Sequence, residues 1–202
     1  MQFDRSKLEA VILRTCNACP AEKLGAVKLH KVLYFLDMLH YAQEGVPVTG
    51  ATYRKRPFGP TCAQLLPALR DMEKERLLDI REVEYYGLRK KEYVPRETEK
   101  AGVLNDNEVA LLDEVIEFVC ERNTAKTISD YSHQLPWEMV EFGAVIPYET
   151  ALMLYPVQVS PEAFEAAEDG AKEVEAVRSS NILEFPLLSS LRSRVRAEVG
   201  RT

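Results

Sequence analysis

Apolar residues in the N-terminal part of the chain follow the spacing of two α-helices. Pro20 and Gly25 predict a turn between them. The second helix, expected from Ala26 to Gln43, is apolar on more than one face, which is typical of a helix at the centre of a core. The first shows a single apolar stripe with positions three and four residues apart: Leu8, Val11, Ile12, Thr15, Cys16 and Cys19.

The pattern changes in the middle of the chain. Residues 46–56 predict a loop or a short extended segment, which Phe58-Gly59-Pro60-Thr61 ends. Pro60 fits the first turn of a following helix, expected from Thr61 to Leu78, and Pro67 predicts a kink in that helix or its division into two. Asp79 to Glu97 is rich in β-branched and aromatic residues around Gly87, which predicts a β-hairpin.

Helical spacing returns in the last part of the pattern. Asn105 to Glu108 has the form of a capping box before a third long helix that reaches Val119. A shorter helix is expected from Ala125 to His133, followed by short helical pieces. The chain is therefore predicted to be mainly α: a compact helical domain with a small β-hairpin, an order compatible with a winged-helix-like arrangement. We place this domain at residues 1–155 and a helical C-terminal extension at residues 156–202.

The extension has an unusual distribution of charge. Residues 160–185 carry seven acidic and two basic residues, whereas residues 187–202 carry four arginines and one glutamate. The apolar positions of the last segment repeat with helical spacing, so we expect a basic amphipathic helix there. It would contact the acidic segment or a partner in preference to a membrane.

Charge and hydropathy exclude several classes of protein. The chain has 202 residues, of which 46% are hydrophobic, and a net charge of −6. This acidity argues against the general attraction that underlies non-specific nucleic-acid binding. The longest apolar stretch, Val32 to Leu36, is far too short to cross a bilayer, and the first residues lack the layout of a secretory signal. A cytoplasmic protein without membrane contact is expected.

No catalytic, cofactor-binding or metal-binding pattern is found. Cys16 and Cys19 form a lone CxxC at a helix end, without the second pair that a zinc site needs, so small core side chains are expected. His30 and His40 lie about 15 Å apart along one helix and cannot share a metal. His133 has no visible nucleophile or metal partner. A structural role is favoured, in which its ring hydrogen-bonds the backbone and closes the turn before Trp137.

Two basic clusters, Arg54-Lys55-Arg56 and Arg89-Lys90-Lys91, leave a winged-helix DNA-binding regulator as the alternative function. The helix that would enter the major groove carries as many acidic as basic residues, however, and so does the hairpin segment. Solvent exposure or contact with an acidic protein is the favoured interpretation of both clusters, and nucleic-acid binding is not expected.

Three segments in order resemble the SocA-like antitoxins, the Panacea domain family. Lys28-Leu29-His30-Lys31-Val32-Leu33-Tyr34-Phe35 is similar to the family's opening motif, Lys-Leu-x-Lys-Leu-Leu-Tyr-Tyr/Phe. Arg56-Pro57-Phe58-Gly59-Pro60 is similar to its Tyr-Gly-Pro loop, with Phe58 in place of the tyrosine. Ile128 to His133, followed by Trp137, is similar to its Leu-Ser-x-x-Ser-His pattern and following tryptophan. The resemblance covers roughly residues 5–150.

The resemblance implies an antitoxin that binds a cognate toxin directly, with no enzymatic activity and no cofactor. It also raises a role as an adaptor to the ClpXP protease, which the founding member has. Phe58 is either a core plug or part of an exposed binding loop, and Trp137 is either a core anchor or an interface residue. The expected partner-binding residues are Arg54, Lys55, Arg56, Phe58, Gly59, Pro60, His133 and Trp137.

Overall fold

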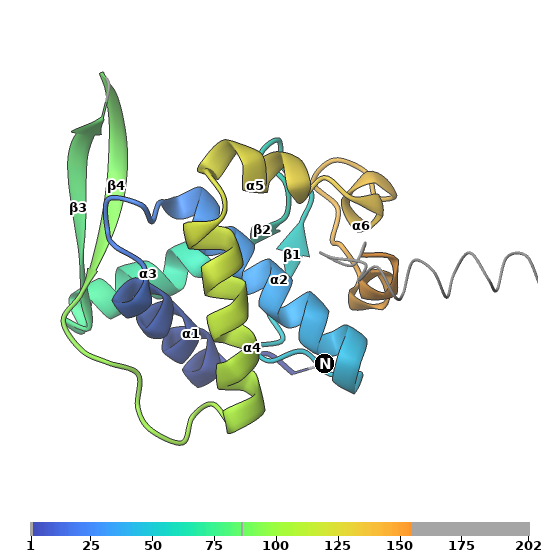
Figure 1. Ribbon diagram of the computed structural model, residues 1–202, viewed down its shortest axis with the longest axis horizontal. Coiled ribbons are helices and arrows are strands. Elements are labelled where there is room, and N and C mark those ends of the chain that lie inside the picture. The colour runs from blue at the N-terminus through green and yellow to red at the C-terminus, as the bar shows by residue number, and fades with distance from the viewer. Residues whose placement is uncertain (1, 86, 155–202) are drawn as a thin grey trace, which may run out of the picture. The chain divides into compact units, whose positions relative to one another are not determined.

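The longest helix among the described residues lies at the centre of the helical domain, as its apolar pattern predicts. The computed structural model describes residues 2–85 and 87–154. Helix α2 (Ala26–Glu44) follows Gly25 and ends at Gly45, whose φ of 73° closes the helix in the left-handed conformation. Most of its side chains are buried because α1, α4 and α5 pack around it (Figure 1).

Helices α1 (Arg5–Ala18) and α4 (Asp106–Ile116) pack against α2, and each begins with a side-chain cap. Asp4 accepts a hydrogen bond from the Lys7 amide, and the predicted capping box of Asn105 and Glu108 is confirmed. Helix α4 continues as the π-helical turn η1 (Glu117–Glu121). The four cysteines are buried free thiols, in agreement with the expectation of small core side chains.

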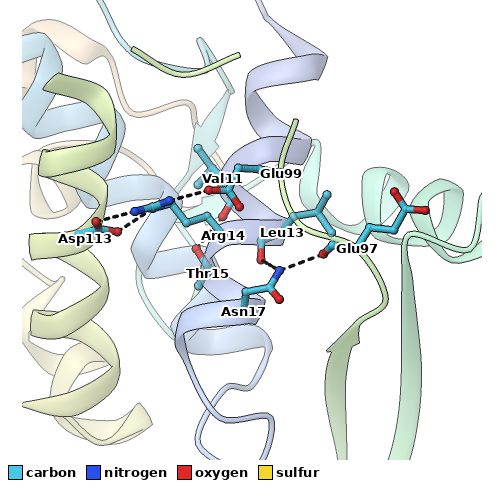
Figure 2. A network of polar contacts seen from close by, with 8 residues as sticks. All are labelled: Val11, Leu13, Arg14, Thr15, Asn17, Glu97, Glu99 and Asp113. Atoms are coloured by element: carbon cyan, nitrogen blue, oxygen red, sulfur yellow. Dashed lines mark hydrogen bonds and ion pairs between the residues drawn. The ribbon is translucent and has the colours of Figure 1, made fainter. Parts of the chain in front are cut away.

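An arginine on α1 ties together segments that lie far apart in the sequence (Figure 2). The Arg14 guanidinium donates through Nε and Nη2 to the two carboxylate oxygens of Asp113 on α4, at 2.7 Å each, and through Nη1 to Glu99 at 2.5 Å. Asn17 extends the contact by donating to the Glu97 carbonyl. A bidentate pair is the strongest form of this interaction, so the connection between the hairpin and α4 is held against α1.

The predicted helix after Pro60 is shorter than expected and does not include that proline. Thr61–Cys62 forms strand β2. Helix α3 (Leu65–Lys74) begins at Leu65, four residues after the expected start at Thr61. Because α3 begins at Leu65, Pro67 is its third residue, where an amide has no partner within the helix to lose. The predicted kink or division of the helix at Pro67 is therefore wrong.

The predicted hairpin is confirmed. Strands β3 (Leu78–Tyr85) and β4 (Leu88–Pro95) pair antiparallel, with Gly87 at a φ of 75° in the turn. The hairpin projects from the helical body in Figure 1, and Leu78 and Tyr93 near its base are buried. The described part of the chain is mainly α with this hairpin, as predicted, and a second two-stranded antiparallel sheet, which includes β2, was not predicted.

The remaining elements form a small sheet and three short helices. Strand β1 (Tyr53–Arg54) pairs with β2 and, on its other side, with residues 143–146 through the bridge between Arg54 and Val145. The short helices are α5 (Ala125–Tyr131), α6 (Leu135–Glu138) and the 3-10 helix η2 (Tyr148–Met153). The predicted boundary at residue 155 and the predicted tail helix lie outside the described residues and stay predictions.

A buried carboxylate joins η2 to the core. Asp37 on α2 accepts hydrogen bonds from the Thr49 amide at 2.6 Å, the Thr49 hydroxyl at 2.5 Å and the Tyr148 hydroxyl at 3.0 Å. The Tyr53 hydroxyl lies 2.8 Å from Asp37 Oδ2 and the same distance from the Leu33 carbonyl. Burial raises the pKa of the Asp37 carboxyl, and these donors act in the opposite direction. One acidic side chain therefore organises three separate segments.

Candidate partner-binding site

A lysine from the central helix holds the loop of residues 54–60. Lys31 on α2 is only 1% exposed, which is unusual for a lysine side chain. Its Nζ donates to the Phe58 carbonyl at 2.6 Å and to the Pro60 carbonyl at 2.9 Å. These bonds satisfy two carbonyl groups that a short loop cannot pair within itself. The conformation of the loop thus depends on α2.

Gly59 allows this close approach. Its φ is 86°, and a Cβ atom at this position would lie 2.2 Å from Ser132 Oγ and 2.6 Å from Lys31 Nζ. The Gly59 amide donates to the Arg56 carbonyl, which closes a tight turn. Both the backbone conformation and the lack of space therefore require glycine at this position.

The turn between α5 and α6 completes the site. The Trp137 indole donates from Nε1 to the Arg56 carbonyl at 3.1 Å, and Lys55 Nζ lies 4.2 Å from the centre of the Trp137 ring. Lys55 Nζ also donates to the Val140 carbonyl at 3.0 Å, just beyond the end of α6. Trp137 therefore anchors the loop to α6 instead of filling the main core.

His133 has a different structural role from the one expected. Its ring stacks on Trp137, with centroids 4.1 Å apart and an angle of 20° between the planes, and Nε2 is buried without a hydrogen-bond partner. The predicted hydrogen bond from the ring to the backbone is thus not made by Nε2. Burial lowers the pKa of His133, and the nearby Lys31 lowers it further, so stacking of a neutral ring is favoured.

The outer edge of the loop faces solvent. Arg54 and Arg56 are exposed, and the Phe58 side chain is 69% exposed. The interpretation of Phe58 as a core plug is therefore wrong: the loop is fixed through its backbone carbonyls, which turn the aromatic ring outward. Because the ring is exposed, Phe58→Ala should disturb no buried packing, and we do not expect a large loss in the free energy of unfolding.

We expect the stability contributed at Lys31 to depend on pH. Burial lowers the pKa of the Lys31 ammonium to about 7. In the unfolded chain the same group titrates near 10.4. Between these values the unfolded state binds more protons, so the free energy of unfolding rises with pH. Denaturant unfolding should show that the free energy of unfolding of the wild type, relative to that of Lys31→Met, rises by about 2 kcal/mol from pH 6.5 to pH 8.5.

The methionine variant removes the background in this comparison, because all other titratable groups are the same in both proteins. A difference that stays constant with pH would mean that the two carbonyl groups keep Lys31 charged throughout.

The structure brings the predicted site residues of the loop, 54–60, together with His133 and Trp137, although these two groups lie more than seventy positions apart in the sequence. It adds two residues that the sequence reasoning missed, Lys31 and Ser132. The available signal for Lys31 was a cation within the helix that is apolar most of the way round.

Within residues 2–85 and 87–154, no group of three or more His, Cys, Asp or Glu side chains is arranged to hold a metal ion. No helix in that part of the chain is both long and apolar enough to cross a membrane.

Comparison with known proteins gives one match. The family model described as "Antitoxin SocA-like, Panacea domain" matches residues 29–138, which include Lys31, the loop of residues 54–60 and Trp137. No curated protein and no solved structure matches the chain.

Proposed function

Because this chain belongs to the SocA-like antitoxins with a Panacea domain, we propose that it neutralises a cognate toxin by binding it directly. The proposal concerns a binding protein and not an enzyme, and it places the function in the cytoplasm, where thiols such as the four here stay reduced. The partner would be a toxin encoded by an adjacent gene.

One observation carries this proposal: the three segments that resemble the family meet at a single place. Lys31 comes from the first segment, the Gly59 loop from the second, and Ser132 and Trp137 from the third. They fix a loop whose side chains point outward, as the exposed Arg54, Arg56 and Phe58 do. A rigid exposed loop loses little conformational entropy when it binds, which favours recognition of another protein.

Growth rescue tests the function. Expression of the protein encoded beside this gene should arrest growth, and co-expression of the full chain should restore it, with the two proteins copurifying. A neighbouring product that is harmless when expressed alone would remove the main support for an antitoxin.

Arg56→Ala should weaken neutralisation with little change in thermal stability. The Arg56 side chain is exposed, and no carboxylate among the described residues pairs with it, so its planar guanidinium is available to a carboxylate of the toxin. We expect affinity to fall roughly tenfold, as loss of one charge-assisted contact would produce. The measurements are calorimetric titration with the toxin and the melting temperature. Arg70→Ala, an exposed arginine on α3, is the matched control; equal weakening by both variants would assign the effect to net charge alone.

Delivery of the toxin to ClpXP is an additional proposal that rests on the family resemblance alone. Purified ClpXP with ATP should degrade the toxin faster when this protein is present. An unchanged toxin half-life would leave direct binding as the means of neutralisation.

A winged-helix DNA-binding regulator is the alternative. The observation that favours it is the order of α3 and the β3–β4 hairpin along the chain. Against it, α3 carries acidic as well as basic side chains on its surface, including the ion pair of Asp71 with Lys74. A gel shift at physiological salt with the upstream DNA of the gene distinguishes the two, because an antitoxin acting only by protein binding should not retard the DNA.

A further inference from the structure

Exposed apolar side chains are frequent in the loop of residues 54–60 and in the segment of residues 135–146, whose backbones are joined by hydrogen bonds. Met139 and Phe142 are 60% and 61% exposed, and Leu135 and Val145 are also exposed. Phe58 on the loop has the same character. We call these five side chains the apolar patch. Single exposed apolar residues are ordinary, but several in one short segment mark a surface that another molecule covers.

The loop and the segment of residues 135–146 form one continuous surface. The Lys55 amide donates to the Ala144 carbonyl, and the Gly143 amide donates to the Lys55 carbonyl, each at 3.0 Å. Arg54 forms a β-bridge with Val145 and donates from Nη1 to the Gly143 carbonyl. Together with the bond from Trp137 to Arg56, these contacts hold the apolar patch beside the cationic edge of the loop.

The cations on this surface form no ion pair among residues 2–85 and 87–154. None of Arg54, Lys55 and Arg56 has a carboxylate oxygen within ion-pair distance among the described residues, whereas Arg5, Arg14 and Arg122 are paired. Such a cluster of cations stands out in a chain with a net charge of −6. Glu138 and Glu141 are exposed in the same region but form no ion pair with the arginines.

We propose that the apolar patch and the cationic edge of Arg54 and Arg56 form the docking surface of this protein, and that the partner presents an apolar surface bordered by carboxylates. This inference rests on the proposed function and specifies the chemistry of the toxin surface. Apolar side chains at the centre would supply most of the affinity, as in other protein interfaces. The arginines at the rim would supply orientation and the rate of association.

The first test changes the centre of the surface in the full chain. The variant Met139→Asp with Phe142→Asp should bind the adjacent-gene protein at least 100-fold more weakly, measured by calorimetric titration. Both side chains are exposed, so the melting temperature should stay near that of the wild type. The matched control is Val46→Asp with Leu66→Asp, which changes two other exposed apolar side chains, 54% and 49% exposed. The control should bind like the wild type.

The second test concerns the rim. Arg54→Glu with Arg56→Glu should weaken binding at least tenfold at physiological salt and reduce the dependence of the association rate on ionic strength. Arg70→Glu with Arg89→Glu, at two exposed arginines elsewhere, is the control for net charge.

Hydrogen exchange of the wild-type chain with and without the same protein provides a readout that needs no variant. Protection is expected in residues 54–58 and 135–146. If the wild type neutralises the toxin but protection lies only elsewhere, or the Met139 and Phe142 variant binds normally, this inference is overturned and the proposed function stands. If the wild type does not bind the adjacent-gene protein, both fail. Self-association of the free chain through these residues, or protection of them by DNA, would also overturn the assigned partner.

Discussion

Gly59→Ala is expected to lower the free energy of unfolding by about 3 kcal/mol and to abolish neutralisation of the toxin. Alanine at a φ of 86° is strained by about 1–2 kcal/mol, and its Cβ would lie 2.2 Å from Ser132 Oγ. The loop must therefore move, which breaks the hydrogen bonds from Lys31 to the Phe58 and Pro60 carbonyls. The measurements are denaturant unfolding and growth rescue.

Gly102→Ala separates the two causes of this loss. Gly102 has a φ of 79° but no heavy atom within 4 Å of the position of a Cβ atom, so only the conformational strain should appear there. The double variant Gly59→Ala with Ser132→Ala should recover part of the stability, because the closest contact is removed. Equal losses for Gly59→Ala and Gly102→Ala would show that the close approach to Lys31 and Ser132 contributes nothing.

Asp37→Ala is expected to lower the free energy of unfolding by about 4 kcal/mol. The carboxylate is fully buried, and its loss leaves the buried Thr49 amide without its acceptor and opens a cavity. The Tyr53 and Tyr148 hydroxyls lose less, because each keeps a backbone carbonyl within reach, at Leu33 and Ala51. Thermal and denaturant unfolding measure the effect.

Tyr148→Phe and Asp71→Ala are the comparisons for Asp37. Tyr148→Phe should lower the free energy of unfolding by about 1 kcal/mol, because it removes the single hydrogen bond that Tyr148 on η2 donates to Asp37 on α2. The second removes an exposed carboxylate that pairs with Arg5 at the surface, and it should cost less than 1 kcal/mol. A loss for Asp37→Ala no larger than for Asp71→Ala would mean that the network of Asp37 does not hold η2 in place.

Much of the fold follows from local patterns. Helix α2, the capping box at Asn105 and the turn at Gly87 were all predictable, because each depends on residues within a few positions of one another. The start of α3 was not predictable in the same way. Pairing of β2 with β1 takes Thr61 and Cys62 out of the helix, and the helical spacing of the residues after Pro60 carries no information about that partner.

The sequence by itself determined the family and predicted which residues form the candidate site. The Gly-Pro loop and the Ser-His and Trp positions are recognisable without coordinates. The order of these motifs was enough to predict an antitoxin-like domain, which the family match over residues 29–138 confirms.

Only the tertiary structure decided how these residues act. It placed the Lys31 ammonium on the carbonyls of a loop 27 and 29 positions away, and it set Trp137 against the Arg56 carbonyl across 81 positions. It also left the side chains of Phe58, Met139 and Phe142 exposed to solvent. The physical reason is that such contacts arise from packing between separate elements, whereas the periodicity of a sequence reports only which face of each element is apolar.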